Sequence, residues 1–320
     1  MTDFKNYIAG QWVASTTGAW FENHNPADTS DLVGRFPRSS VDDVNRAVVS
    51  AQRGFAAWKA VPAPARGDAL RRVGDLLSAR KEELADLMTR EMGKPLAETR
   101  GDVQEGIDTA YYAGTMGRQL FGKTVPSELS NKWAMSFRRP IGVCGLITPW
   151  NWPIHQITCK VAPALAAGCT MVLKPSEIAP LNALIFAEVL HDAGVPAGVF
   201  NLVNGDGPNV GAVMAAHPLI DMMSFTGSTR AGIEVAKIAA GTVKRVAQEL
   251  GGNSPNIVFD DADLQAAIEG GIANCFNNSG QSCNSPARML VPFGKMQKAA
   301  EIARRAAEAL SVGDPRSERT

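Results

Sequence analysis

The second half of the chain repeats one short pattern, in which an apolar run is followed by a turn and an amphipathic helix. The runs predict strands at 141–147, 170–173, 199–203, 222–225 and 245–250, and the helices between them fall near 154–167, 181–193, 209–216 and 230–240. Short apolar strands that alternate with helices are typical of a parallel sheet with helices on both faces. The predicted fold class is therefore α/β, with a doubly wound parallel sheet. Such sheets bind ligands at the carboxyl ends of their strands, so we expect the chemistry at the strand-to-helix turns.

The N-terminal part of the chain is interpreted as scaffold. Residues 4–37 mix short apolar runs with Gly, Asn and Pro, which predicts small strands and turns. A helix follows, announced by Ser40 with Asp43 as a capping pair. Its apolar stripe ends at Phe55 and Trp58, which we interpret as core residues.

A projecting ribbon is predicted after the scaffold helices. Helical periodicity continues over about 64–92 and 95–118, with Gly93 as a stop, and it is lost at residues 121–139. This last segment carries a proline and alternating apolar residues, which indicate two strands. Its apolar side chains serve either as a subunit contact or as ordinary core packing.

Composition excludes several functional classes. At 320 residues and 45% hydrophobic content, the chain is long enough for two domains and a sizeable core. Its 32 basic and 32 acidic residues cancel, and no basic run suggests a nucleic-acid partner. No apolar run approaches the roughly 18 residues of a membrane helix, and residues 1–5 lack the pattern of a signal peptide. These features predict a soluble, cytoplasmic protein.

The cysteines predict free thiols in a reducing compartment. Their number is odd, and they show neither a C-x-x-C pair nor zinc spacing. They are Cys144, Cys159, Cys169, Cys275 and Cys283. The four histidines are scattered along the sequence, so no metal site is expected.

One cysteine, Cys283, closes a polar loop that runs Phe276-Asn277-Asn278-Ser279-Gly280-Gln281-Ser282-Cys283. Most intracellular cysteines are small buried hydrophobes, but a polar neighbourhood leaves this thiol reachable. Gly280 lets the backbone approach a substrate closely. We interpret Cys283 as a covalent nucleophile, and Cys275, which lacks such a loop, as structural.

Two strand ends carry candidate nucleotide contacts. The segment 225–232 runs from a strand into a helix, where Ser228 and the free N–H groups suit a pyrophosphate; an ordinary helix cap is the alternative. Its glycine spacing matches neither the dinucleotide nor the P-loop motif. In the second segment, Lys174 and Glu177 follow another strand and can both reach a ribose, although by local sequence alone a solvated Lys/Glu loop is the better explanation.

Two further strand ends carry candidate catalytic groups. Asn151 lies in a stiff Trp/Pro turn, and its amide can stabilise an oxyanion if the fold brings it near Cys283; a simple turn asparagine is the alternative. Glu249 ends the last strand and is followed by two glycines. It is either a general base for water or one more surface acid.

Taken together, these stretches resemble the aldehyde dehydrogenase superfamily, of the NAD(P)-dependent, hydrolytic type. The resemblance extends from the N-terminal helices to the end of the chain, and its most specific parts are the Gly280–Cys283 loop and the Glu249–Gly252 motif. It implies that Cys283 is the nucleophile, Glu249 the general base, and Asn151 an oxyanion donor that works with the Cys283 backbone N–H. The cofactor contacts it implies are Thr148, Pro149, Trp150, Lys174, Ser176, Glu177, Gly207, Phe225, Gly227, Ser228, Leu250 and Gly251.

The implied reaction oxidises an aldehyde to a carboxylate through a thioester on Cys283. Glu177 favours NAD over NADP, because a carboxylate at the ribose repels a 2′-phosphate, although NADP remains possible. The side chains of Trp152, Ile154 and Phe276 suggest an aliphatic or medium-chain aldehyde, or a semialdehyde. The family implies a homodimer or homotetramer.

The resemblance also implies a division into domains. It assigns residues 1–120 and 141–251 to a Rossmann-like NAD-binding domain, residues 121–140 to an oligomerisation ribbon, and residues 252–320 to a catalytic domain. The family's Glu-x-Phe-Gly-Pro motif is not found, so this catalytic domain is expected to be truncated. Two alternatives follow. One is a nucleotide-binding fragment without turnover. The other is a CoA-acylating semialdehyde dehydrogenase, against which Glu249 argues.

Overall fold

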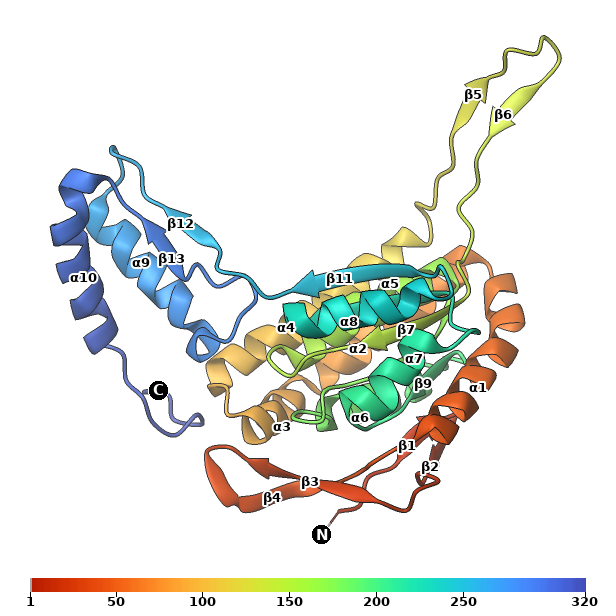
Figure 1. Cartoon of the computed structure of the whole chain (residues 1–320), viewed down its shortest axis with the longest axis horizontal. Helices are drawn as coiled ribbons and strands as arrows, with labels where there is room; N and C mark the ends of the chain where they lie inside the picture. Colours follow the sequence, from red (N-terminus) through yellow and green to blue (C-terminus); the bar gives the residue numbers. More distant parts are fainter. Residues whose placement is uncertain (1) are drawn as a thin grey trace.

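The computed structural model describes residues 2–320, and a seven-stranded sheet forms its centre (Figure 1). The strand order is β11-β10-β7-β8-β9-β1-β2. The strands are β1 (Asn6–Ile8), β2 (Gln11–Val13), β7 (Val143–Ile147), β8 (Thr170–Lys174), β9 (Phe200–Leu202), β10 (Met222–Gly227) and β11 (Arg245–Leu250). The strands from β11 to β9 are parallel, as the repeat predicted, and β1 and β2 extend the sheet antiparallel beyond β9.

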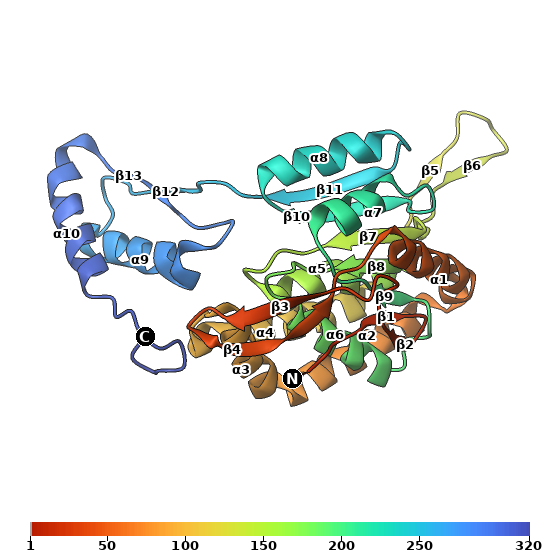
Figure 2. The same cartoon turned by 60° about the horizontal axis from the view of Figure 1, so that its bottom comes forward.

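Helices cover both faces of this sheet (Figure 2). One layer contains α2 (Ala63–Ala79), α4 (Leu96–Met116), α5 (Pro153–Ala167) and α6 (Leu181–Asp192), with α3 (Lys81–Met92) outside it. The other contains α1 (Val41–Ala60), the π-helix η1 (Gly207–Gly211), α7 (Ala212–Ala216) and α8 (Thr229–Ala240). Along β7, Cys144 and Leu146 join the first apolar cluster, whereas Val143 and Ile147 join the second. This alternation confirms a doubly wound sheet.

The strand order creates a crevice between β7 and β10. These two strands are neighbours, but the helix after β7 packs on one face of the sheet and the helix after β10 packs on the other. Ligands of open α/β sheets bind at such a switch point, beyond the carboxyl ends of the strands. Residues 148–151 follow β7 here, and Ser228 follows β10.

Helix ends follow the predicted signals. Ser40 and Asp43 form the reciprocal capping box of α1, and Gly93 ends α3 in the left-handed region with φ of 75°. Trp58 is buried in the core, as expected. Phe55 is only half-buried, so the prediction that it is a core residue was wrong.

The predicted ribbon consists of β5 (Thr124–Pro126) and β6 (Trp133–Met135), which pair antiparallel and project from the body (Figure 1). Trp133 is 76% exposed and Phe137 is 73% exposed. Within the described chain these side chains therefore do not take part in core packing.

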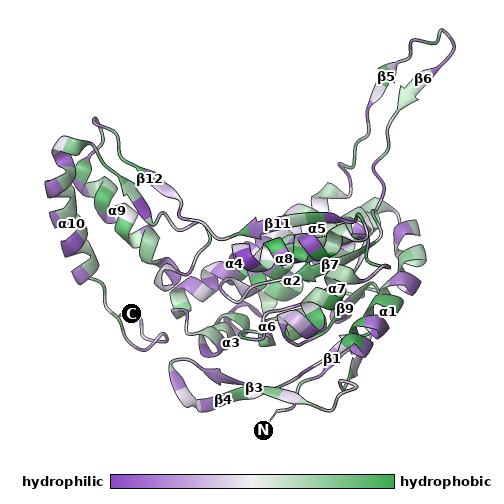
Figure 3. Cartoon of the chain, viewed as in Figure 1, coloured by the Kyte–Doolittle hydropathy of each residue, from purple (hydrophilic) through white to green (hydrophobic). Residues whose placement is uncertain are grey.

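A small outer unit follows the sheet and comprises residues 255–308. Its elements are β12 (Pro255–Ile257), α9 (Leu264–Phe276), the 3₁₀ turn η2 (Asn277–Gly280), β13 (Arg288–Leu290), the 3₁₀ turn η3 (Phe293–Lys295) and α10 (Met296–Glu308). β12 and β13 pair in parallel. Apolar residues concentrate in the central sheet and its helices, whereas α10 carries many polar ones (Figure 3). None of the helices within residues 2–320 combines the length and apolar character that crossing a membrane requires.

Candidate active site

The turn after β7 meets the loop that ends at Cys283. Asn151 lies just before α5, and its side-chain Nδ2 donates to the Gln281 carbonyl at 2.8 Å. Asn278 donates in return from its own Nδ2 to the Asn151 carbonyl at 2.9 Å. Two segments far apart in sequence are thus joined beside the carboxyl ends of the strands.

The loop before Cys283 has an unusual backbone. Asn278, Ser279 and Gly280 all have positive φ, at 52°, 55° and 76°. A left-handed conformation is strained for serine and tolerated by asparagine and glycine. The N–H of the buried Asn278 donates to the Glu98 carboxylate at 2.7 Å, so α4 holds the loop in this shape.

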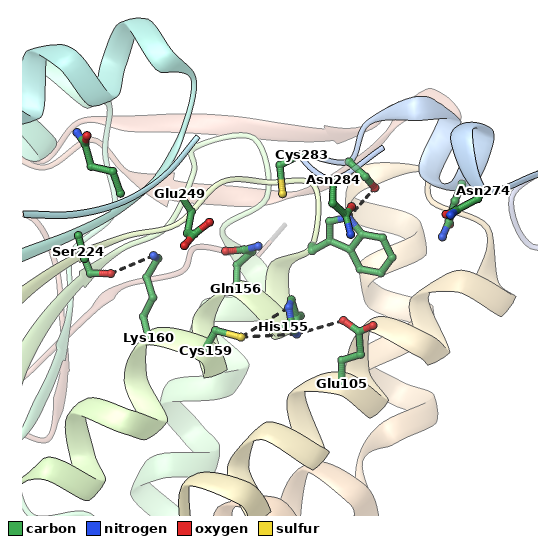
Figure 4. A pocket seen from close by; sticks show the side chains of 15 residues that line it. Glu105, His155, Gln156, Cys159, Lys160, Ser224, Glu249, Asn274, Cys283 and Asn284 are labelled. Carbon is green, nitrogen blue, oxygen red and sulfur yellow. Dashed lines mark hydrogen bonds and ion pairs between the residues drawn. The ribbon is translucent and has the colours of Figure 1, made fainter. Parts of the chain in front are cut away.

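Cys283 opens into a cavity of about 510 Å³ whose walls also include Glu249 and Lys160 (Figure 4). Cys283 is half-buried, and Glu249 projects into the same space from the end of β11. A thiol and a carboxylate that share one cavity can act in turn on one substrate, the first as nucleophile and the second as base.

Lys160 is a site residue that our sequence reasoning missed. Its Nζ donates to the Ser224 hydroxyl at 3.1 Å (Figure 4). Burial lowers the pKa of Lys160 to about 8, against the opposing effect of the Glu249 charge. A lysine on the apolar face of the helix predicted at 154–167 was the available signal, because such a residue needs a buried partner.

A second set of missed residues lines the wall below Cys283 (Figure 4). His155 lies 3.2 Å from Glu105, and its ring is within 3.7 Å of the Cys159 sulfur. The hydrogen bond with Cys159 raises the pKa of His155, and the Glu105 charge acts in the same direction. Helical spacing places 152, 155, 156 and 159 on one face, which could have revealed this wall.

The apolar wall expected from the sequence is only partly present. Trp152 lines the cavity, but Ile154 is fully buried where α5 packs against Gly106 of α4, and Phe276 is not among the lining residues. The expectation was wrong because adjacent positions of a helix point in different directions. In the part of the chain that the structure describes, the wall is mainly polar.

Two donors can meet an oxyanion beside Cys283. One amide hydrogen of Asn151 is used by Gln281, and the other is left for a ligand. Among residues 2–320, the backbone N–H of Cys283 donates to no protein acceptor. Asn151 and Cys283 also line a common groove, so the pair has the composition of an oxyanion hole.

That groove, of about 340 Å³, occupies the crevice between β7 and β10. The predicted cofactor positions Pro149, Trp150, Gly227, Ser228 and Gly251 line it. Ser228 caps α8, accepting the Ala231 N–H at 3.3 Å. The hydroxyl of Thr226 is buried there without a partner, as expected where a polar ligand binds.

The remaining predicted contacts lie outside the groove. Lys174 is buried, and its Nζ donates to the Pro175 carbonyl at 2.9 Å and to Glu177 at 3.1 Å, whereas Glu177 itself is exposed. Burial lowers the pKa of Lys174. The others are Thr148 and Phe225, which are buried, Ser176 and Leu250, which are half-buried, and Gly207, which is exposed at the start of η1.

The groove and the cavity meet at Ser282 and Cys283, which line both. A family model described as "Aldehyde dehydrogenase family" matches residues 12–320. The chain belongs to the aldehyde dehydrogenase family. The Rossmann-like parallel sheet that its strand order describes is the fold of its structural neighbours.

Named relatives within the family are similar over nearly the whole chain. The 3-succinoylsemialdehyde-pyridine dehydrogenase of a Pseudomonas species is 47% identical, over 98% of this chain and 65% of that protein. The NADP(+) succinate-semialdehyde dehydrogenase GabD of Escherichia coli K12 is 42% identical, over 96% and 64%. A mutant of aldehyde dehydrogenase C from Pseudomonas syringae, solved with NAD+ and octanal, superimposes with a TM-score of 0.95 at 47% identity, over 99% and 64%. The chain thus spans less than two thirds of these relatives' length.

Proposed function

We propose that the protein oxidises an aldehyde to a carboxylate with NAD or NADP as hydride acceptor. The observation that carries this proposal is the position of Cys283, where a groove lined by the switch-point turns meets a cavity that contains Glu249. Relatives that are semialdehyde dehydrogenases, and a neighbour solved with NAD+ and octanal, support it.

In the proposed mechanism, the Cys283 thiolate attacks the aldehyde carbon and forms a thiohemiacetal. The Asn151 amide and the Cys283 backbone N–H stabilise its oxyanion. NAD(P)+ bound in the groove would supply the acceptor for the hydride of this carbon. Glu249 then takes a proton from a water that attacks the resulting thioester, and the Cys283 thiolate leaves as the carboxylate forms.

Pro149, Trp150, Gly227, Ser228 and Gly251 would hold the cofactor in the groove. The orphaned Thr226 hydroxyl and the free N–H groups at the start of α8 fit a polar, anionic ligand. At Gly251 a side chain would meet only open space, so the chain leaves room there for a ligand.

Glu177 is proposed to disfavour NADP. Its carboxylate is exposed beyond β8, and it would repel a 2′-phosphate at the ribose. We expect Glu177→Ser to raise the ratio of kcat/KM for NADP to that for NAD. Exposed Glu188→Ser on α6 is the matched control, and an unchanged ratio in Glu177→Ser would refute the assignment.

The remaining expectations stay proposals. Residues 1–120 and 141–251 would form the NAD-binding domain and 252–320 part of the catalytic domain. The ribbon at 121–140, with its exposed aromatic residues, would join subunits into a homodimer or homotetramer. All five cysteines are free thiols, which suits a reducing compartment such as the cytoplasm.

The substrate is proposed to be an aliphatic aldehyde or a semialdehyde. Octanal in the neighbour favours the first, and the names of the relatives favour the second. An aldehyde panel with NAD and with NADP, followed by product analysis with and without CoA, separates the options. Acyl-CoA as the sole product would show that CoA, and not water, releases the acyl group, as in the CoA-acylating alternative.

The test of the reaction itself is NADH formation by the protein that carries this chain. Cys283→Ala should abolish turnover, whereas Cys275→Ala should retain it, because Cys275, on α9, lines neither cavity. Turnover that survives in Cys283→Ala would overturn the proposed function.

A further inference from the structure

A buried ion pair lies beneath the site and takes no part in the reaction proposed above. Lys94 and Asp102 are both fully buried side chains, with Nζ and Oδ2 3.2 Å apart. Desolvation lowers the pKa of Lys94 and raises that of Asp102, so each charge depends on the other. Isolated buried charges are costly, and a buried pair is by itself weak evidence for stability.

The pair contacts the wall of the cavity through one aromatic ring. The Lys94 Nζ lies 3.4 Å from the centre of the Trp152 ring, which is the geometry of a cation–π contact. The other edge of this indole points to the Cys283 loop, and Nε1 donates to the Ser282 hydroxyl at 2.9 Å. An unbroken chain of contacts therefore leads from Lys94 to the residue before the nucleophile.

The same pair also fixes the start of α5. Oδ1 of Asp102 accepts the N–H of His155 at 2.8 Å, in the first turn of a helix that has no side-chain cap of its own. A carboxylate suits this position, because helix N-termini leave N–H groups unpaired. One turn earlier on α4, Glu98 accepts the N–H of Asn278. One face of α4 thus contacts both sides of the seam, which is the contact between the start of α5 and the loop that ends at Cys283.

We propose that Lys94 and Asp102 are positioning residues, which hold the Trp152 ring so that its N–H fixes Ser282 and, with it, the backbone N–H and thiol of Cys283. The inference rests on the proposed function for its kinetic consequences, but the geometry at Cys283 is testable without turnover. Thiol reactivity and the oxyanion donor both depend on where this backbone lies.

The first experiment is a double-mutant cycle between Trp152→Phe and Ser282→Ala. Phenylalanine keeps a ring over Lys94 and removes the N–H, and alanine removes the acceptor. Each single variant should lower kcat about fivefold, the effect of one lost hydrogen bond, with a smaller change in KM. The double variant should be no worse than either single one, because the same bond is lost. The matched control is Trp20→Phe, whose ring also faces a cation, Arg35, at 5.8 Å and lies outside the site.

The second experiment neutralises the pair in Lys94→Met/Asp102→Asn. The asparagine can still accept the His155 N–H, so the start of α5 keeps its cap while the cation over Trp152 is lost. The readout is the rate at which iodoacetamide alkylates Cys283 without aldehyde or NAD, followed on its peptide with Cys275 as internal reference. This rate should fall about threefold relative to wild type, a smaller loss than the roughly fivefold expected for one lost hydrogen bond. The exposed pair Lys237 and Glu234, neutralised as Lys237→Met/Glu234→Gln, is the control.

Lys94→Arg tests whether folding alone explains a loss. It keeps the charge and should retain most of the alkylation rate, whereas a variant that only failed to fold would also lose its far-UV circular dichroism. Additive losses in the cycle, or an unchanged Cys283 rate in the neutralised pair, would overturn the positioning role. If Cys283 of the wild-type protein is alkylated by iodoacetamide but the protein makes no NADH, only the proposed function is refuted.

Discussion

The central sheet and the outer unit contribute different things to the site. The sheet has an apolar cluster on each face, and its strand ends present Asn151 and Glu249 from a densely packed frame. Within residues 2–320, the outer unit, which carries Cys283, has a core cluster of four buried residues with partly buried neighbours around it, namely Val258, Ile268, Ala299 and Ile302. The proposed nucleophile thus comes from the region with the smaller described core, and polar contacts to α4 and to the turn before α5 hold its loop. We therefore expect the geometry of the proposed reaction to be set at the seam between these two regions.

The largest expected effect separates the two regions by packing. Phe186→Ala removes a side chain that is 1% exposed and leaves a cavity in the central core. It should lower the free energy of unfolding by about 3–5 kcal/mol. Phe293→Ala in the outer unit removes a side chain that is 97% exposed, and the change should stay within about 0.5 kcal/mol. Urea unfolding measures both. Equal losses of unfolding free energy in the two variants would contradict the difference in packing between the two regions.

The second prediction concerns pH and Glu91, a buried residue of α3. Its carboxylate accepts hydrogen bonds from the start of α6, and burial raises its pKa to about 7. The folded state therefore holds a proton that the unfolded state releases near pH 4.5. Stability from this group should fall as pH rises from 4.5 to 7, by about 3 kcal/mol. Glu91→Gln should flatten that part of the curve in urea unfolding, and an identical slope in both proteins would refute the shift.

The smallest effect lies in the Cys283 loop. Ser279 has a left-handed backbone, and Ser279→Gly removes the strain of that conformation, which is about 1–2 kcal/mol. Glycine also raises the entropy of the unfolded chain, which costs about 0.5–1 kcal/mol, so the free energy of unfolding should rise slightly. Ser254→Gly, at a position without positive φ, should instead lose stability. Thermal unfolding compares them. A loss in both variants would show that the loop stores no strain.

The sequence predicts the central sheet better than the seam. Strand and helix positions follow from local periodicity, and the capping pair at Ser40 is local as well. The attachment of β1 to β9 is long-range and was not predictable. Cys283 stands out because it closes a polar loop, whereas Glu249 and Asn151 are ordinary residues for a strand end and a turn and were assigned roles through the family resemblance. Lys94, in the turn between α3 and α4, does not stand out, since a lysine in a turn looks ordinary until its buried partner is known. For Lys160 the only signal is its place on the apolar face of a helix.

The central claim is that Cys283 carries an acyl group which water, activated by Glu249, releases. Glu249→Gln tests it most directly, with mass spectrometry and rapid kinetics on an aldehyde that the wild-type protein oxidises. We predict a burst of about one equivalent of NADH per site, slow steady-state turnover, and an acyl adduct on the peptide that contains Cys283. Unchanged steady-state turnover, or an adduct on any other cysteine, would contradict the claim.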